Sequence, residues 1–385
     1  MIRSPKTYST KQLIAGDEAL YEYCVSSNAS RTAFFISDNI ADTHEIYNRL
    51  FSDIYGSRDF KIIAVIAREP NKAQLDGYRY SLSEFKPDEI IAIGGGSVMD
   101  TAKALCLFYE LPHLCWEDAF RPYQVEKRKR TVNLVAVPTT SGTGSEMTGA
   151  AMVLDEEGRK QMILTNEIVP DLAILDYSFL KSLPPKVIVY SGVDAIVHAL
   201  EAATDTITDP ITQFYAIQSV VTLMNDLPKS LVGDLEARAR VHVASSFAGF
   251  AINHGGCGLA HSLNTPGEIY HLPHGLITGM VFPLTLQYYP DSYALISILN
   301  QLGISFQKGQ AGRRLSEVVW KLYESIGMPS SLKELGIDKA DYLSHIDTLV
   351  QRFEDNDRSS SVACCVTSKS EIQSIFYNLF DQSNS

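Results

Sequence analysis

The stretch that decides the fold is Glu89-Ile-Ile-Ala-Ile-Gly-Gly-Gly-Ser-Val-Met-Asp100. Its apolar run is continuous rather than alternating, which is typical of a strand in a parallel sheet that helices cover on both faces. The run leads directly into Gly94, Gly95 and Gly96, and residues 97–109 then have helical spacing. Such a turn places backbone N–H groups and a helix N-terminus at the carboxyl edge of the sheet, where they can bind a phosphate or pyrophosphate. The alternative is a tight turn that needs only one glycine, but three in a row favour the close approach of a ligand.

Other segments of the first half repeat this alternation of strands and helices. Apolar runs that predict buried strands occupy residues 32–38, 61–66 and 132–137, and residues 73–85 have helical spacing. Shorter runs predict a hairpin and a last strand, at residues 151–154, 162–164 and 172–175.

The pattern changes after Pro184-Pro185. Strand-like runs give way to long helical periodicities, at residues 187–203, 210–227, 237–252, 276–289, 315–326 and 340–353. The sequence therefore predicts two domains. The first is an α/β nucleotide-binding domain over residues 1–184, with a parallel sheet between helices, and the second is an all-α metal-binding domain over residues 185–385.

Composition and charge argue against several kinds of partner. With 45% hydrophobic and 20% charged residues, the chain has the composition of a soluble globular protein. The net charge of −12 argues against binding of nucleic acid, which needs an excess of clustered Lys and Arg. We expect the one basic run, Lys127-Arg-Lys-Arg130, to be a solvated loop. Residues 1–6 hold no apolar signal core and no run approaches a membrane span, so we expect a cytoplasmic protein with no membrane partner.

The cysteines lack the spacing of a zinc finger or of a disulfide framework. Most lie in apolar surroundings, so we expect reduced, buried thiols of the kind found in cytosolic proteins. The six are Cys24, Cys106, Cys115, Cys257, Cys364 and Cys365.

Two further features of the first half indicate a nucleotide. The loop Pro138-Thr-Thr-Ser-Gly-Thr-Gly-Ser-Glu146 gathers hydroxyls and glycines that can bond phosphate and ribose oxygens. Asp38 follows a predicted strand, where its carboxylate can accept hydrogen bonds from a ribose 2′-hydroxyl and would repel a 2′-phosphate. This placement favours NAD, with NADP as the alternative, although an Asp at the end of a strand is also a common helix cap.

The second half carries a set of metal-ligand residues between residues 191 and 275. Asp194 and His198 are four apart in a segment with helical spacing, so both project from one helix face. His261 and His274 follow, each among glycines and small residues. One Asp and three His suit Fe(II), Zn(II) or a similar divalent ion. A lone helical histidine is more often a core or surface residue than a ligand, and it is the cofactor loops upstream in the sequence that favour the metal site.

Four blocks of the sequence resemble the iron-containing, or group III, alcohol dehydrogenases. These are residues 94–103, 138–146, 194–201 and 271–275, in the order found in that family. The resemblance implies a nucleotide-binding α/β domain, a helical domain and an active-site cleft between them. It implies one divalent metal, Fe(II) or Zn(II), held by Asp194, His198, His261 and His274. It also implies contacts with NAD(P) at Asp38, Gly95, Gly96, Ser97, Asp100, Thr139, Thr140, Thr143 and Lys160.

The sequence departs from the family pattern between the third and fourth ligands. His261 and His274 are thirteen residues apart, one fewer than in most members. Most members also have a second histidine four residues after the third ligand, and here that position holds Thr265. Because that histidine is usually assigned a proton-relay role, the relay falls to Thr265, to His271, to a ribose hydroxyl or to water. The alternative for His271 is a structural role in its loop.

The resemblance implies an alcohol dehydrogenase or aldehyde reductase that depends on NAD(P) and on a divalent metal. Hydride would pass between nicotinamide C4 and a small alcohol or carbonyl substrate whose oxygen the metal binds as a Lewis acid. Family members often pair, so we expect a homodimer or a larger homo-oligomer.

Two other functions are compatible with part of the pattern. A non-redox lyase or cyclase that resembles dehydroquinate synthase would also bind NAD and one divalent ion. Its anionic substrate would need several Lys and Arg residues, which the metal-site segments lack. A binding protein or sensor with a degenerate site is suggested by the missing histidine, while the intact ligand set argues against it.

Overall fold

The computed structural model describes residues 8–41, 45–54, 58–355 and 368–381. By internal contacts the chain divides into two compact units, Met1–Leu183 and Pro184–Ser385. Each unit has its own architecture, and the two are described separately.

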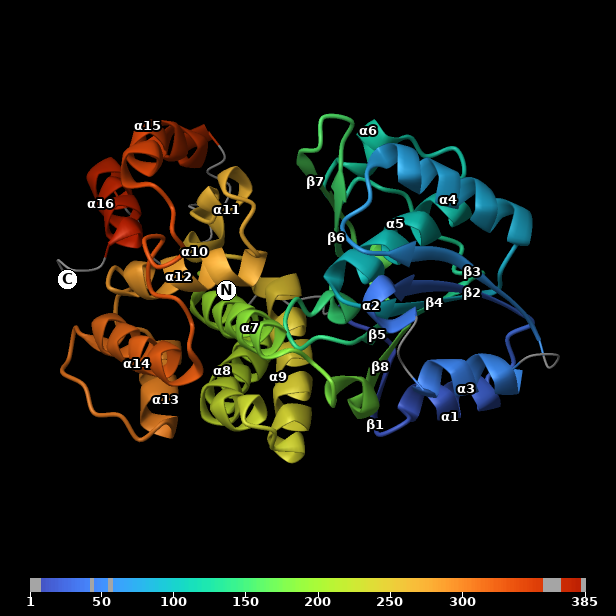
Figure 1. Cartoon of the computed structure of the whole chain (residues 1–385), viewed down its shortest axis with the longest axis horizontal. Helices are drawn as coiled ribbons and strands as arrows, with labels where there is room; N and C mark the ends of the chain where they lie inside the picture. Colours follow the sequence, from blue (N-terminus) through green and yellow to red (C-terminus); the bar gives the residue numbers. More distant parts are fainter. Residues whose placement is uncertain (1–7, 42–44, 55–57, 356–367, 382–385) are drawn as a thin grey trace. The chain divides into compact units, whose positions relative to one another are not determined.

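A six-stranded parallel sheet forms the centre of the N-terminal unit (Figure 1). Every neighbouring pair of strands is parallel, which confirms the predicted α/β class. The spatial order is β1 (Gln12–Gly16), β8 (Leu172–Asp176), β5 (Asn133–Pro138), β4 (Glu89–Gly94), β2 (Arg31–Ser37) and β3 (Asp59–Ile66). The edge strand β1 was not predicted from the sequence.

Helices cover both faces of this sheet (Figure 1). One face packs against α1 (Ala19–Ser26) and α3 (Glu45–Ile54), and the other against α4 (Lys72–Phe85) and α5 (Gly96–Glu110). In β2, Phe34 and Ile36 join the core beneath α1, while Phe35 joins the core beneath α5. Because both faces are buried, successive strand residues must all be apolar, which explains the continuous runs in the sequence.

Short elements complete the N-terminal unit. The predicted hairpin is present and antiparallel. The remaining elements are α2 (Asp38–Ala41), α6 (Trp116–Ala119), β6 (Ala150–Leu154), β7 (Lys160–Leu164), and the 3-10 helices η1 (Ser145–Met147), η2 (Asn166–Ile168) and η3 (Tyr177–Leu180).

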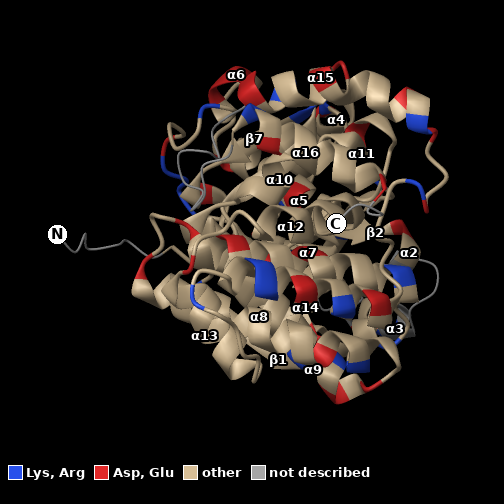
Figure 2. Ribbon diagram, turned by 90° about the vertical axis from the view of Figure 1, so that its left-hand side faces the viewer, with Lys and Arg blue, Asp and Glu red and all other residues tan. Residues whose placement is uncertain are grey.

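The C-terminal unit is helical, and its described residues contain no strand. Its helices are α7 (Pro185–Thr204), α8 (Pro210–Leu231), α9 (Leu235–Gly255), α10 (Leu259–Ser262), α11 (Pro266–Ile269), α12 (His274–Leu286), α13 (Tyr293–Gln301), α14 (Ala311–Ile326), α15 (Lys339–Asp355) and α16 (Lys369–Phe380). Figure 2 shows acidic and basic residues mixed along α14, as is usual on a solvent-facing helix.

Helix α7 is the core helix of this unit and packs against α8, α9 and α12. By length and mean hydropathy it could cross a membrane, so the expectation that no run approaches a membrane span was wrong. However, 83% of its most apolar window is buried inside the protein. Its apolar character therefore reflects a helix that neighbouring helices surround, as in the core of a soluble protein.

The structure corrects two expectations about individual residues. Arg128, in the basic run expected to be a solvated loop, has a fully buried side chain. Its guanidinium lies 3.1 Å from a Glu110 carboxylate oxygen and 3.6 Å from one of Asp171, whereas Lys127 and Lys129 are exposed as expected. Cys115 is exposed rather than buried. The other expectations on residues 1–6, Cys364 and Cys365 concern residues outside the described ranges.

The buried position of Arg128 leads to a testable difference within one basic run. Replacing Arg128 by Ala would leave the buried Glu110 carboxylate without its cation, whereas Asp171 would keep Lys11 and Arg130, so we expect a loss of about 3–5 kcal/mol in the free energy of unfolding. Replacing the exposed Lys129 by Ala should change it by less than about 0.5 kcal/mol.

Urea unfolding can measure this change in the N-terminal unit alone. The chain has two tryptophans, Trp116 in the N-terminal unit and Trp320 in the C-terminal unit. In a Trp320→Phe background, the fluorescence of Trp116 reports the N-terminal unit. Equal effects of the Arg128 and Lys129 substitutions would contradict a structural role for the Arg128 ion pairs.

Candidate metal centre and nucleotide-binding loops

The four predicted metal ligands come together in the C-terminal unit. Asp194 and His198 lie one turn apart on α7, His261 lies on α10, and His274 is the first residue of α12. Asp194 and His198 are buried, His261 is largely buried, and His274 is exposed. One potential ligand atom from each of the four residues lies within 4.8 Å of each of the others.

The close packing of α12 on α7 places His274 at this centre. A Cβ atom on Gly275 would lie 2.2 Å from the carbonyl oxygen of Tyr190 and 3.1 Å from Cβ of Asp194. Any larger residue would therefore push the first turn of α12 away from α7. Gly275 is required by this approach of two helices, and not by an unusual backbone conformation.

The separations between the ligand atoms match those around a bound ion. Asp194 Oδ1 lies 3.6 Å from His274 Nε2 and 3.7 Å from His261 Nε2, and Asp194 Oδ2 lies 3.9 Å from His198 Nδ1. These distances are too long for hydrogen bonds. Ligand atoms held about 2.1 Å from a tetrahedral ion lie about 3.4 Å from one another. The group is therefore spaced as ligands around an ion would be.

Three of these atoms have no other partner. Asp194 Oδ1, His198 Nδ1 and His261 Nε2 are buried and make no hydrogen bond to any described residue. Buried polar atoms are nearly always paired, so each orphaned atom requires an explanation. A divalent cation would satisfy all three, and the donor set of one carboxylate and three imidazoles suits Fe(II) or Zn(II).

The protonation states of Asp194 and His198 also suit a cation. Burial raises the pKa of Asp194, but the imidazoles of His198, His274 and His261 outweigh burial and hold this pKa well below its usual range. Burial lowers the pKa of His198 to about 4. At neutral pH the carboxylate is therefore charged and the His198 ring is neutral, which are the forms that bind metal.

Two residues contact the ligand side chains from outside the metal centre, and the sequence analysis did not identify them. His261 Nδ1 lies 2.6 Å from Glu201 Oε2, and His274 Nδ1 lies 3.4 Å from the side-chain nitrogen of Asn264. Glu201 follows Asp194 by seven residues on α7, so helical spacing places it on the same face and could have identified it. No comparable signal marks Asn264.

The two predicted relay residues differ in their exposure to solvent. The Thr265 hydroxyl is buried and has no hydrogen-bond partner among the described residues. His271 is exposed, with a left-handed backbone at φ +52°. It does not join the group of ligand atoms formed by the four metal-site residues.

In the N-terminal unit, the two predicted cofactor loops lie against each other. Gly95 precedes the first turn of α5, and its Cβ position would lie 3.6 Å from Thr140 Oγ1. A Cβ atom on Gly96 would lie 3.0 Å from Cγ2 of Thr143. Thr139 is buried, and its N–H donates to the carbonyl of Gly94. The turn thus combines the helix N-terminus with several hydroxyls at the carboxyl edge of the sheet.

A buried lysine supports these loops. Lys103 is fully buried on α5, and its ammonium donates to the carbonyls of Ser145, Thr148 and Ala150. It also lies 3.3 Å from Asp100, whose carboxylate accepts further hydrogen bonds from the Ser145 hydroxyl and the Met152 N–H. Asp100, predicted as a cofactor contact, is therefore tied into this network.

The remaining predicted cofactor residues are exposed or lie at the edge of these loops. Asp38 begins α2 at the end of β2, is exposed, and accepts a hydrogen bond of 2.7 Å from the N–H of Asn39. Ser97 is in the first turn of α5, and its carbonyl accepts a bond from Thr101. Lys160 begins β7, is exposed, and lies 3.9 Å from Glu69.

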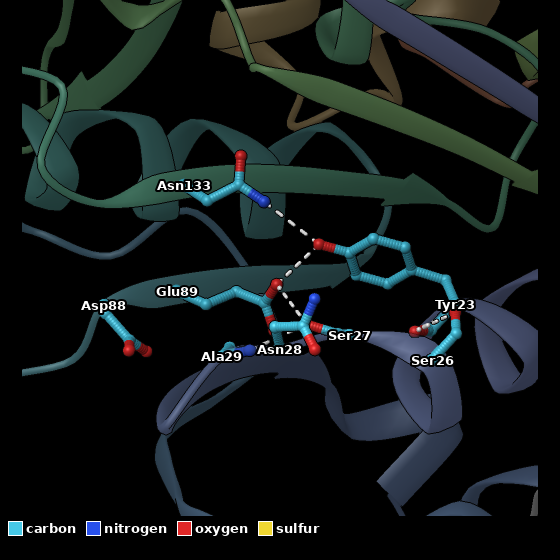
Figure 3. A pocket seen from close by; sticks show the side chains of 8 residues that line it. All are labelled: Tyr23, Ser26, Ser27, Asn28, Ala29, Asp88, Glu89 and Asn133. Atoms are coloured by element: carbon cyan, nitrogen blue, oxygen red, sulfur yellow. Dashed lines mark hydrogen bonds between the residues drawn. The ribbon is translucent and has the colours of Figure 1, made fainter.

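A hollow of about 410 Å³ lies elsewhere in the N-terminal unit (Figure 3). It is found at the first residues of β4 and β5, where Asn133 donates to the Tyr23 hydroxyl and this hydroxyl donates to Glu89. Nucleotides bind at the opposite, carboxyl ends of parallel strands. Because its polar groups bond to one another at the amino ends, we do not assign the cofactor to this hollow.

Comparison with known proteins identifies the family. The family model described as iron-containing alcohol dehydrogenase matches residues 10–177, and the model of the C-terminal part of the Fe-containing alcohol dehydrogenase family matches residues 188–380. The chain belongs to the iron-containing alcohol dehydrogenase family.

Individual relatives agree with this family. An alcohol dehydrogenase of Thermococcus barophilus is 32% identical over 351 residues, which cover 89% of this chain and 90% of that protein. An NADPH-dependent butanol dehydrogenase of Clostridium saccharobutylicum is 30% identical over 303 residues, 76% of this chain and 77% of that protein. The solved structure of the iron-containing alcohol dehydrogenase of Thermococcus thioreducens has a TM-score of 0.87 and 29% identity, and the match covers 97% of this chain and 99% of that one.

The family membership confirms the predicted fold class and the predicted enzyme class, an alcohol dehydrogenase. The named relatives are oxidoreductases. They favour hydride transfer over the lyase and over the binding protein that the sequence left as alternatives.

The geometry of the centre predicts which residues retain metal. His198→Ala removes a buried ligand on a helix that the rest of the C-terminal unit surrounds, so we expect the bound ion to be lost while the fold is kept. His113→Ala is the matched control, because His113 is exposed and lies in the other unit. Metal content by elemental analysis, together with far-ultraviolet circular dichroism, measures both. Unchanged metal content in the folded His198→Ala variant would contradict the assignment.

Proposed function

We propose that the protein is an NAD(H)-dependent alcohol dehydrogenase that uses one divalent metal, Fe(II) or Zn(II), to interconvert small alcohols and their aldehydes or ketones. The observation that supports this most strongly is the group of buried, unpartnered ligand atoms of Asp194, His198 and His261, spaced as around an ion. Family membership supplies the reaction class.

The proposal assigns the metal to Asp194, His198, His261 and His274. When bound, the ion supplies Lewis-acid polarisation of the substrate oxygen. Three neutral imidazoles and one carboxylate cancel only one of its two positive charges, so the site keeps a positive charge where negative charge develops on that oxygen. Asp194 and the three imidazoles fix the ion, and the exposure of His274 leaves that side of the centre open for a small substrate.

The cofactor is assigned to the loops of the N-terminal unit. The backbone N–H groups of Gly95, Gly96 and Ser97 at the start of α5 would bind the pyrophosphate, supported by the hydroxyls of Thr139, Thr140 and Thr143. Asp38 would accept hydrogen bonds from the adenosine ribose and favour NAD over NADP. Lys160 is assigned a further cofactor contact. Asp100 acts by shaping the loop through Ser145 and Lys103.

The proton path is assigned to Thr265, with His271 and water as further carriers. The buried Thr265 hydroxyl is chemically able both to donate and to accept a proton, and it has no competing partner among the described residues. His271 is exposed and could exchange protons with solvent. This assignment gives the relay a hydroxyl where most of the family has an imidazole.

The remaining parts of the proposal concern domains, partners and location. Residues 1–184 form the nucleotide-binding domain and residues 185–385 the metal-binding domain. The partner is a small alcohol or aldehyde, and we propose a homodimer or larger homo-oligomer in the cytoplasm. The buried free thiols of Cys24 and Cys106 are compatible with a reducing compartment.

A screen of small alcohols and aldehydes tests the reaction. After loading with Fe(II) or Zn(II), we expect steady consumption of NADH with at least one small aldehyde. His274→Ala should abolish it while NADH binding, followed by nicotinamide fluorescence, is kept, because the proposed cofactor residues all lie in the other unit.

The same screen separates the proposal from its alternatives. Turnover of a substrate with no net change in NADH absorbance would favour the lyase. Binding of NADH without turnover of any compound by the metal-loaded protein would favour a sensor. Full activity of a metal-free His274→Ala variant would contradict the metal assignment.

Cofactor preference provides a separate prediction. We expect a lower KM for NADH than for NADPH, and Asp38→Asn should move this preference towards NADPH by about tenfold, or roughly 1.4 kcal/mol. The amide removes the charge that repels a 2′-phosphate and one of the acceptors for the ribose.

Asp59→Asn is the control for this change. It makes the same change in charge at the amino end of the neighbouring strand β3, where Asp59 is exposed. A lower KM for NADPH than for NADH in the wild type, or equal shifts in the two variants, would contradict the role of Asp38.

A further inference from the structure

Glu201 is a buried acid outside the four-ligand group. It lies on α7 with its side chain fully buried. Both carboxylate oxygens are used: Oε2 accepts a 2.7 Å bond from the N–H of Gly258, and Oε1 accepts a 2.6 Å bond from the N–H of Ala260. Oε2 also lies 2.6 Å from His261 Nδ1.

The partners of Glu201 fix how the His261 ring is used. Two backbone N–H groups and a buried site hold the carboxylate in place, and an ionised carboxylate can only accept hydrogen bonds. The His261 nitrogen that faces it must therefore be the donor, Nδ1–H. When the ring is neutral, the other nitrogen, Nε2, has its lone pair free, and it is this atom that is buried, unpartnered and 3.7 Å from Asp194.

Gly258 allows the Glu201 carboxylate to approach the backbone closely. A Cβ atom on Gly258 would lie 3.1 Å from Cδ and from Oε1 of Glu201, tighter than ordinary contact. The segment that leads into α10 therefore rests directly on this carboxylate. Because His261 is the third residue of α10, the same contact fixes the position of the His261 ring.

We propose that Glu201 is a positioning residue that fixes the ring orientation and the Nδ1–H tautomer of His261, so that Nε2 faces the ion site. This inference rests on the metal centre of the proposed function. Glu201 itself contacts neither the ion site nor the substrate, and it acts through His261. A partner of this kind on a ligating histidine typically changes metal affinity by about 10–100-fold.

Glu201→Gln is the sharpest variant because it keeps the size of the side chain. The amide has one acceptor oxygen where the carboxylate has two, so it cannot accept from Ala260 on one side and from Gly258 and His261 on the other. In either orientation its NH2 group faces a backbone N–H donor, that of Ala260 or that of Gly258. In the second orientation His261 Nδ1 would also have to become the acceptor, which places the proton on Nε2. We expect the dissociation constant for Co²⁺ to rise about 10–100-fold.

Gly258→Ala is a second variant, which disturbs the contact between Gly258 and Glu201 without changing Glu201 itself. The added Cβ would displace the carboxyl group from its contact, so we expect a smaller loss of Co²⁺ affinity, about 3–10-fold on the same scale. Cys257→Ser is the matched control. Its thiol lies beside Glu201 and His261, and the proposed positioning role of Glu201 does not involve this thiol. We expect its affinity for Co²⁺ to equal that of the wild type.

The measurement uses the full chain stripped of metal. Co²⁺ is titrated in competition with a colorimetric chelator, and the visible absorption of the bound cobalt reports ligand geometry. The melting temperature of the metal-free protein is recorded for every variant. In protein labelled with ¹⁵N-histidine and loaded with Zn²⁺, the wild-type His261 ring should show a protonated Nδ1 and a metal-bound Nε2.

The outcomes separate this inference from the proposed function. Weaker Co²⁺ binding and an altered cobalt spectrum in the Glu201 and Gly258 variants, with Cys257→Ser unchanged, would support the positioning role. A lower melting temperature of the metal-free variants with unchanged Co²⁺ affinity would show that Glu201 serves only the fold, and would overturn the inference while leaving the metal centre intact. Failure of the wild type to bind Co²⁺ would instead overturn the metal centre itself.

Discussion

The C-terminal unit depends on one buried carboxylate, and its oxygen Oδ1 has no hydrogen-bond partner among the described residues. The Asp194 carboxylate faces three imidazoles at 3.6–3.9 Å, beyond hydrogen-bonding distance. An ionised carboxylate buried without a close partner costs several kcal/mol even after the protein relaxes. A cation among these four side chains replaces the missing interactions, so metal binding and folding of this unit are expected to be thermodynamically coupled.

The rest of the unit follows from the need to bring ligands from separate elements to α7. Asp194 and His198 require only a helix, since its period alone places them together. His274 requires α12 to approach α7 so closely that only glycine fits at position 275. His261 requires a short helix whose start is fixed by a carboxylate from α7. The apolar, almost completely buried surface of α7 supplies the packing that offsets the cost of these buried polar groups.

Local sequence pattern predicted the features that depend on neighbours in the chain. The buried strands, the glycine turn before α5 and the hairpin each follow from a few consecutive residues, and the ligand pair of α7 follows from helical spacing. The edge strand β1 was missed because Gln12-Leu-Ile-Ala-Gly16 is too short and too weakly apolar to stand out. Its pairing with β8 joins residues far apart in the sequence.

Residues whose role depends on distant partners could not be predicted in this way. Arg128 looked like a member of a solvated basic run, because Glu110 and Asp171 meet it only in the folded structure. Glu201 is the intermediate case. Its position on the face of Asp194 was visible in the sequence, but its contacts with Gly258, Ala260 and His261 depend on how the chain returns to α7.

Lys103 in the N-terminal unit and Asp194 in the C-terminal unit are buried charges that the chain treats in opposite ways. Lys103 is as deeply buried as Asp194, yet it has carbonyl partners from Ser145, Thr148 and Ala150 and the nearby charge of Asp100. Such a charge is satisfied by the fold and shapes the loops around it. Asp194, His198 and His261 retain buried atoms that the fold leaves unpaired. Binding of an external ion or substrate requires unpaired groups of this second kind. A group whose polar atoms are all bonded within the protein has none available for a ligand.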